Sequence, residues 1–575
     1  MATEIRPTET QTAAETQQFV PLLPAKYALN PYQASCVMLG GLLLMYFSYI
    51  PLFHSDIWGH VSYGAWILDH RALPTIDPFT PLAEGVALTD TAWLGQVLFA
   101  AAARQGGPHW VSHLFALTVF LTYVINVSTF SRRSGSLLAG TLSCVLAFIV
   151  GFSRHAIVRP EVFGGLCLAA LFWLVSRADF EEPAMQDDSE PRRSTAPRSD
   201  WWLYVGVALV QLAWANLHGS FIIGLAILGC VLAGRVLEVL WKTQEPWQVL
   251  QDAQSRRWLL VLETGIAVTL INPYGIGLFL NVFQFSSNPN LKDVLEWFPL
   301  SGTSLEGIHF IISMVVLVVL FRHSRRPVRA ADVLMLCLFG LAVAPTIRMI
   351  GWYAVVVTYV LAPHVGELLP RVWPEPFKPR AEPLDARTFH WSVGAALVLW
   401  VAFAFSPVSQ PVLGGKLRTD DHVYSRDTPR GITKYLREHP PQGQIFNPQW
   451  WGDWLAWDGP KSLKVFMTTN AVHLTPSRVW KDYMQVARAE AGWELTLDRY
   501  DVNTLVLHKE LQSGLWRAVR RSGKWQVAYD DKVGVVYVRG RELAALNKRK
   551  SEEAKQKANK ETATTQSSKT TKEAS

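Results

Sequence analysis

The stretch that follows the first long apolar segment is rich in side chains that can exchange protons. From His54 to His70 it reads HSDIWGHVSYGAWILDH, with two aspartates and three histidines. An acidic residue near a membrane surface can act as a general base toward a hydroxyl or an amine if its pKa is suitable. Asp56 is the candidate base, whereas Asp69 and Asp77 fit a helix end and a turn.

Further polar residues recur at the ends of later apolar segments, in loops that would share one side of a membrane. Ionisable groups at membrane depth are costly and usually face a cavity or a partner. Single residues have ordinary explanations, since Asn272 could close a turn and His218 could bond between helices. Because several loops converge, we predict one shared site that binds substrate through these residues: His60, Arg154, His155, Arg159, Glu161, Asn216, His218, Asn272, Glu296 and Arg348.

Arginines beside an acidic residue favour one kind of chemistry. Guanidinium groups bind phosphate oxygens through paired hydrogen bonds. A phosphate on a lipid carrier would lie at this depth, with its apolar tail between helices. The set therefore suits glycosyl transfer from a lipid-phosphate sugar. Asp56 would deprotonate the acceptor, and Arg154, Arg159 or Arg348 would stabilise the leaving phosphate.

The elements that must position these residues are membrane-spanning helices. Half of the 575 residues are hydrophobic, and continuous apolar runs recur from Gln33 to Phe405. Such runs are long enough to cross a hydrocarbon core of roughly 30 Å. We therefore predict a polytopic α-helical membrane protein with about 11 transmembrane helices, near 34–53, 110–130, 136–153, 161–176, 201–217, 221–241, 257–272, 307–322, 329–345, 349–366 and 390–406.

Basic residues predict the orientation of these spans. The net charge of +7 does not indicate nucleic-acid binding, because arginines and lysines concentrate in the loops that alternate with the motif-bearing ones. The positive-inside rule then puts the N-terminus in the cytoplasm and the chain after Pro407 outside. Residues 91–105 could cross the membrane, but crossing would invert every later loop. We predict an interfacial helix there, and another over Asp56–His70.

The chain divides into four predicted regions. Residues 1–30 form a disordered cytoplasmic N-terminus, and 31–406 form the transmembrane domain, with a first outer loop over 54–109. Short β-rich runs such as VNTLVLH, separated by helical patterns, predict a small extracytoplasmic α/β domain over 407–540. The Lys-, Glu- and Thr-rich tail 541–575 is predicted to be disordered, as is the loop 179–200. The five cysteines lie in apolar segments without metal-type spacing.

This arrangement resembles the GT-C superfamily of integral-membrane glycosyltransferases, which includes protein O-mannosyltransferases, aminoarabinose transferases and oligosaccharyltransferases. The segments that carry the resemblance are DIWGHVSYGAWIL, RPEVF, WANLHGS, NPYG and EWFP. The resemblance implies a polyprenyl-phosphate-linked sugar donor and an acidic residue in a long first outer loop, here Asp56. It implies work at the outer face of a bacterial cytoplasmic membrane on an unknown glycan, lipid or protein acceptor.

A second likeness lies in the outer domain. NPQWWGDWLAW resembles the WWDYG signature of oligosaccharyltransferases, but here Asp453 follows a glycine and the tyrosine is missing. Trp450, Trp451 and Asp453 could recognise the acceptor. The alternative interpretation of this segment is a tryptophan-rich turn in the core of a small domain.

Two questions stay open at this point. A transporter or flippase of a lipid-linked or small polar substrate is the alternative function, and a purely structural protein is the third. A divalent metal ion is also left open, since Asp56, His60 and Glu161 could supply ligands.

Overall fold

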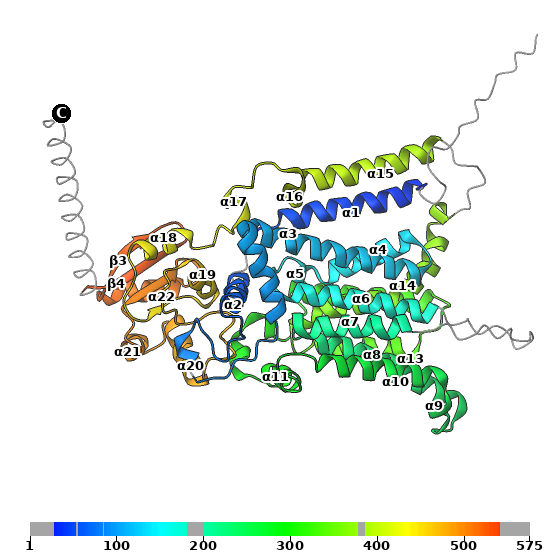
Figure 1. Cartoon of the computed structure of the whole chain (residues 1–575), viewed down its shortest axis with the longest axis horizontal. Coiled ribbons are helices and arrows are strands. Elements are labelled where there is room, and N and C mark those ends of the chain that lie inside the picture. Colours follow the sequence, from blue (N-terminus) through cyan, green and yellow to red (C-terminus); the bar gives the residue numbers. More distant parts are fainter. Residues whose placement is uncertain (1–27, 53–55, 84, 181–200, 378–385, 541–575) are drawn as a thin grey trace, which may run out of the picture.

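The chain forms a helical bundle with a smaller sheet-containing part at one end (Figure 1). The predicted disordered N-terminus, the tail and most of the predicted loop 179–200 lie outside the described residues. The computed structural model describes residues 28–52, 56–83, 85–180, 201–377 and 386–540.

A helix lies at each of the eleven segments that were predicted to span the membrane. Five helical segments are long and apolar enough to cross by length and composition, and α15 with the bent segment after it could make a sixth. The protein is therefore a multi-pass membrane protein, and the number of eleven spans stays a prediction. The helices at these segments are α1 (Pro31–Tyr49), α3 (Trp93–Ser134), α4 (Leu137–Val150), α6 (Glu161–Phe180), α7 (Trp201–Leu217), α8 (Phe221–Thr243), α10 (Ala253–Thr269), α12 (Leu305–His323), α13 (Ala330–Val343), α14 (Ile350–Val372) and α15 (Ala386–Phe405).

Small residues let helices of the bundle approach each other closely. A Cβ atom at Gly234 of α8 would lie 2.3 Å from the backbone nitrogen of Ala331 in α13. One at Gly366 of α14 would lie 2.0 Å from the backbone oxygen of Ser134, at the end of α3. In lipid, where apolar side chains gain little by leaving the solvent, such close packing holds helices together.

Helix α3 breaks near its start. Gly106 and Gly107 have non-helical dihedral angles, and Gly107 has φ 63° and ψ −155°, which only glycine adopts without strain. The part before the break lies across the end of the bundle, beside α2 (Asp56–His70) (Figure 1). The sequence predicted a separate helix over 91–105, and its place at the membrane interface stays a prediction.

The part of the chain after α15 contains one four-stranded sheet. The strand order is β1 (Ile445–Phe446), β2 (Thr504–His508), β4 (Gly534–Arg539), β3 (Trp525–Asp530). β1 runs parallel to β2, and β4 is antiparallel to both β2 and β3. The run KVFMTT, residues 464–469, makes only an isolated bridge, between Gln444 and Lys464. The side chain of Asn447 donates to the backbone oxygen of Met467 and accepts from the backbone nitrogen of Phe466. These are backbone groups that hydrogen bonds to a neighbouring strand would otherwise use.

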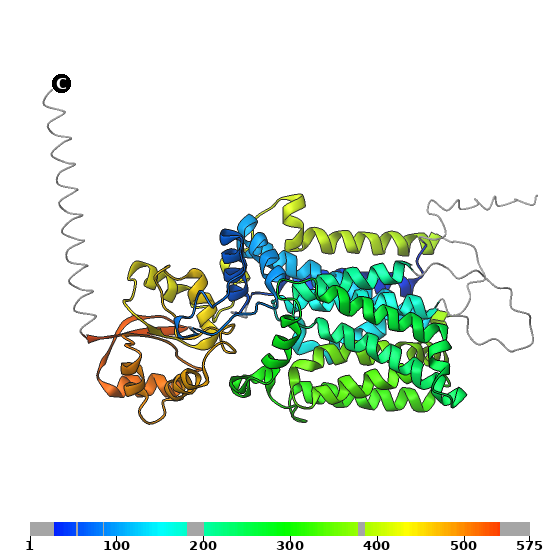
Figure 2. The ribbon, with the colours of Figure 1, turned by 60° about the horizontal axis from the view of Figure 1, so that its bottom comes forward.

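Helix α2 lies between the bundle and this outer part in both views (Figures 1 and 2). Helix α19 (Gln449–Asp458), which contains the WWGDW segment, packs against it. The ring of Trp58 lies 5.1 Å from that of Trp454, and a Cβ at Gly59 would lie 2.2 Å from Oδ1 of Asp453. The outer part therefore holds the helix whose first residue is Asp56.

On its other side, α2 packs against α3 through Gly64. We expect Gly64→Ala to lower the free energy of unfolding by about 1–3 kcal/mol, because a Cβ there would lie 2.1 Å from the backbone oxygen of Gln96. Alanine normally stabilises a helix relative to glycine by about 0.5–1 kcal/mol, so the expected sign is reversed. The measurement is thermal unfolding of the purified protein.

The matched control is Gly40→Ala in α1, where a Cβ meets nothing within 4 Å. We expect it to be neutral or stabilising. Equal stability of the two variants would contradict the close α2–α3 contact.

Candidate active site

Six charged side chains form one chain of alternating ion pairs at the end of the bundle nearest α2. The order along the network is Asp56, Arg159, Glu296, Arg154, Glu161, Arg348. Nε of Arg159 lies 3.2 Å from Oδ2 of Asp56, and both terminal nitrogens of Arg159 bond the carboxylate of Glu296. Arg154 lies 3.2 Å from Glu296 and 2.9 Å from Glu161, and Arg348 lies 3.6 Å from Glu161.

Five separate parts of the chain deliver these six residues. Asp56 begins α2, and Arg154 lies in the short helix α5 (Phe152–His155). Arg159 precedes α6 and Glu161 is its first residue, where a carboxylate is favoured by the helix dipole. Glu296 lies in the 3-10 turn η4 (Leu295–Trp297) and Arg348 in η5 (Ile347–Met349). The convergence predicted for these six residues is present in the fold.

The network is largely shielded from solvent. The side chain of Asp56 is 8% exposed and that of Arg159 is 10% exposed. Buried charges persist only when they are paired and hydrogen-bonded, because the cost of losing water is several kcal/mol per ion. Three guanidinium groups against three carboxylates balance the formal charge. Burial alone would raise the pKa of Glu296, but Arg154 and Arg159 hold it well below its usual range.

A polar cavity opens on one side of the network. The space between its walls is about 1290 Å³, including the part open to solvent. Its walls come from α2, the start of α3, the loop around η4, and the part of the chain after α15. Six of the predicted site residues line it: Asp56, His60, Arg159, His218, Glu296 and Arg348.

One oxygen of Asp56, which lines this cavity, has no hydrogen-bond partner among the described residues. Oδ2 is held by Arg159, so this oxygen is Oδ1. A buried carboxylate that is oriented by an arginine and has one free oxygen can accept a proton from a substrate.

The two cavity histidines that the sequence predicted as site residues, His60 and His218, are neutral. Burial lowers the pKa of His60 to about 4, although Asp56 acts in the opposite direction. Burial likewise lowers the pKa of His218 to about 3, against the effect of Glu161. Nδ1 of His218 lies 2.8 Å from the hydroxyl of Ser220 and 3.2 Å from the backbone nitrogen of the same residue. Both rings therefore offer neutral hydrogen-bonding groups to a ligand.

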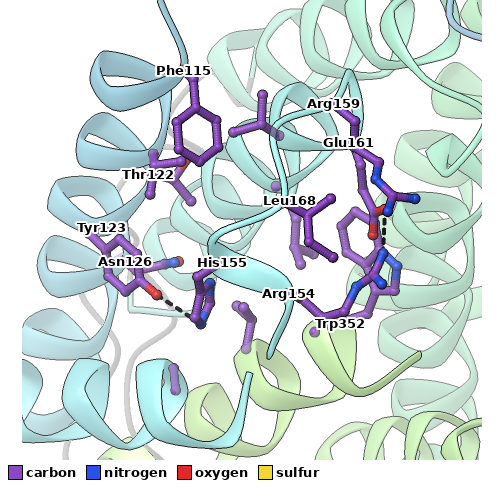
Figure 3. Close-up of a pocket in the computed structure, with 17 residues that line it drawn as sticks. Phe115, Thr122, Tyr123, Asn126, Arg154, His155, Arg159, Glu161, Leu168 and Trp352 are labelled. Atoms are coloured by element: carbon purple, nitrogen blue, oxygen red, sulfur yellow. Dashed lines mark hydrogen bonds and ion pairs between the residues drawn. The ribbon is translucent and has the colours of Figure 1, made fainter. Parts of the chain in front are cut away.

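A second, mostly apolar groove lies on the other side of the network (Figure 3). The space between its walls is about 770 Å³. Side chains from α3, α4, α6 and α14 form the walls, among them Phe115, Leu168 and Trp352. Arg154, Arg159 and Glu161 line the same groove, so Arg159 contributes to both spaces.

Three predicted site residues have other positions. His155 faces the groove, where its Nε2 lies 2.9 Å from the hydroxyl of Tyr123. The amide of Asn216 donates to the backbone oxygens of Leu212 and Ile271, and that of Asn272 closes the NPYG turn. Neither asparagine lines the cavity or the groove, and the oxygen of Asn216 accepts from Nε1 of Trp93.

The sequence-based metal ligands do not form a metal-binding group. Among the described residues, no three His, Cys, Asp or Glu side chains are grouped to hold a metal ion. Asp56 is instead paired with Arg159, and Glu161 with Arg154 and Arg348. These residues, paired with arginines, thus do not fit a metal ion.

Several lining residues were not among the predicted site residues. Asp90 and Gln96 lie on the wall formed by the start of α3. Asn470 and His473 come from the outer part of the chain, as does Trp450, which was a candidate for acceptor recognition. The burial of Asp90 depends on long-range packing, which no local sequence pattern reports.

No protein-family model matches this chain, and no curated protein matches it in sequence. Solved structures do match in fold. The oligosaccharyltransferase of Archaeoglobus fulgidus, tethered with an acceptor peptide containing the NVT sequon, is 11% identical with a TM-score of 0.52, over 88% of this chain and 74% of that one. ArnT from Cupriavidus metallidurans in the apo state is 13% identical with a TM-score of 0.50, over 87% of this chain and 96% of that one.

Both similar proteins are GT-C glycosyltransferases. At such low identity the likeness shows the fold alone. The resemblance to the GT-C superfamily that the sequence predicted is thus confirmed at the level of the fold.

We expect Arg159→Met to lower the free energy of unfolding by about 3–5 kcal/mol, because it leaves Asp56 without its cation and removes the bidentate partner of Glu296. The control is Arg104→Met, which breaks an exposed 2.6 Å pair with Asp69 and should cost about 1 kcal/mol or less. Chemical denaturation in detergent compares the two. Similar losses in both variants would argue against the network as a buried structural unit.

Proposed function

We propose that this protein is a membrane glycosyltransferase of the GT-C type. It would move a sugar from a polyprenyl-phosphate-linked donor to an acceptor at the outer face of the bacterial cytoplasmic membrane, with the N-terminus in the cytoplasm. The observation that carries the proposal is the position of the ion network between an apolar groove and a polar cavity. Arg159 lines both spaces, and Asp56 lines the cavity beside it.

The two spaces match the two halves of such a donor. A polyprenyl tail is apolar and fits between helices, where Phe115, Leu168 and Trp352 offer apolar walls. The tail leads toward Arg154 and Arg159, so the phosphate would reach the guanidinium groups. The sugar beyond the phosphate would enter the cavity that Arg159 also lines.

Arg348 is the arginine best placed to change partners when a phosphate arrives. Its distance of 3.6 Å to Glu161 is the longest in the network, and its guanidinium lies 5.5 Å from the centre of the Trp297 ring. Arg159, by contrast, is held by two carboxylates. In the proposal Arg348 binds the phosphate oxygens, and Arg159 keeps Asp56 oriented.

The proposed reaction is a single displacement at the anomeric carbon. An acceptor hydroxyl or amine attacks this carbon from the side opposite the phosphate, and its proton passes to Oδ1 of Asp56. The bond between the anomeric carbon and the phosphate oxygen breaks with inversion. The electron pair stays on the polyprenyl phosphate, whose added negative charge Arg348 stabilises.

The acceptor would enter from the outer part of the chain. Trp450 is the one residue of the WWGDW segment that lines the cavity, whereas Trp451 is 2% exposed and Asp453 is 1% exposed. Asp453 accepts from the backbone nitrogen of Thr469 and is therefore used in packing. These positions give no support to a peptide site like that of an oligosaccharyltransferase, so the acceptor class stays open between glycan, lipid and protein.

Asp56→Asn should abolish transfer, because an amide cannot take the proton of the acceptor. Radiolabelled sugars on undecaprenyl phosphate would be supplied to the protein in lipid nanodiscs, with an envelope extract as the source of acceptors. Label should leave the donor lipid fraction with wild type and with Asp69→Asn, an exposed carboxylate of the same helix. Transfer by Asp56→Asn at the wild-type rate would refute the base assignment.

The same assay separates a transferase from a transporter. A transporter or flippase would carry the intact labelled lipid across the bilayer without breaking its bond to the sugar. Such movement without bond cleavage would refute the proposed reaction.

Filling the groove should weaken donor binding. A Cβ at Gly165 of α6 meets nothing within 4 Å, so Gly165→Leu can extend into the groove that Gly165 lines without forcing the helices apart. We expect the KM for the donor to rise at least about tenfold, as for a buried apolar contact worth more than 1.4 kcal/mol.

Gly229→Leu in α8 is the matched control, because a Cβ there also meets nothing within 4 Å and Gly229 does not line the groove. It should leave the KM unchanged. An unchanged KM in Gly165→Leu would mean that the tail binds elsewhere.

A further inference from the structure

Three side chains on the cavity wall are joined by hydrogen bonds that the proposed reaction does not use. Nε2 of Gln96 donates to Oδ1 of Asp90 at 3.0 Å and lies 3.3 Å from Nδ1 of His60. His60 is one helical turn after Asp56 in α2, so the set reaches from the loop before α3 to the candidate base. Asp90, Gln96 and His60 all line the cavity.

This wall carries acceptor atoms without donors. Oδ2 of Asp90, Oε1 of Gln96 and Oδ1 of Asp56 are buried and have no hydrogen-bond partner in the part of the chain that the structure describes. The three residues are only 5–6% exposed. A buried acceptor left unpaired costs about 1–3 kcal/mol, so three on one wall indicate that a ligand supplies the missing donors.

Helix capping explains only part of the role of Asp90. Its Oδ1 accepts from the backbone nitrogen of Ala92 at 3.1 Å, at the start of α3. That bond requires neither burial nor the second oxygen. Burial raises the pKa of Asp90 to about 7, as expected for a carboxyl group with few donors. A bound hydroxyl would supply one.

The wall lies beside Arg159 of the ion network. A Cβ at Gly95, next to Gln96, would lie 3.0 Å from Cβ of Pro160, which directly follows Arg159. Trp450, Asn470 and His473 belong instead to the outer part of the chain, where the acceptor would enter. The group nearest to Asp90 and Gln96 is then the sugar of the donor.

We propose that Asp90 and Gln96 bind the hydroxyl groups of the donor sugar and select a neutral, hydroxyl-rich sugar over an acidic one. Sugar hydroxyls donate to carboxylate and amide oxygens, which the wall presents without partners. A sugar carboxylate would meet Asp56, and the ionised form of Asp90, as like charges and could not donate a hydrogen bond to them. This inference rests on the proposed function. It narrows the sugar of the donor to the class of neutral, hydroxyl-rich sugars.

The test compares the affinity of four lipids for the purified protein in nanodiscs by native mass spectrometry. The lipids are undecaprenyl phosphate and its glucosyl, mannosyl and glucuronosyl derivatives. Wild type should bind at least one neutral-sugar lipid about tenfold more tightly than undecaprenyl phosphate, the effect of one or two good hydrogen bonds. The glucuronosyl lipid should bind no more tightly than undecaprenyl phosphate.

Asp90→Asn keeps Oδ1 for the backbone bond and puts an NH₂ group in the place of the unpaired oxygen. It should lose most of the tenfold preference, while its affinity for undecaprenyl phosphate and its unfolding temperature stay at wild-type values. Asp90→Ser, which also keeps an oxygen near Ala92, should behave alike. Asp69→Asn should keep the preference.

Three results would overturn the inference: no preference of wild type for either neutral-sugar lipid, a preference for the glucuronosyl lipid, or full preference in both Asp90 variants. None of them depends on turnover. Failure of the proposed function would appear in the label-transfer assay instead, where wild type would transfer no label.

Discussion

The requirement that buried charges be paired shapes the end of this membrane protein nearest α2. Three arginines and three carboxylates are largely shielded from water. Each charge can be buried only because the next residue of the network carries the opposite charge. The helices that carry them must therefore end at the same level. In the proposed function, a donor phosphate takes Arg348 from Glu161, and Glu161 keeps Arg154 as its partner.

The rest of the fold keeps this network in place. Close helix contacts at glycines make the bundle a firm base, and the break at Gly106 and Gly107 turns the start of α3 across its end. Helix α2 is then held between α3 and α19, with Gly64 and Gly59 at the two contacts. The outer part of the chain thus serves the site in two ways, because it supports α2 and forms one wall of the cavity.

The sequence predicted the parts of this site that follow from topology. Arg159 and Glu296 are far apart in the chain, but alternation of spans places their loops on one side, and they bond each other. Side-chain partners were not predictable in the same way. Asn272 bonds the backbone of its own turn, and Asp90 is a buried residue of the cavity wall. Neither outcome follows from the local sequence, because both depend on which atoms lie within hydrogen-bonding distance in the folded chain. The division into domains and the eleven spans stay predictions.

The most direct test of the account is an experimental structure of the protein with undecaprenyl phosphate in a lipid bilayer. The account predicts the phosphate within hydrogen-bonding distance of Arg348 or Arg159, and the tail in the groove between α3, α4, α6 and α14 beside Gly165. A phosphate bound at the opposite end of the bundle, or a tail on the outer surface of the helices with the groove empty, would contradict it.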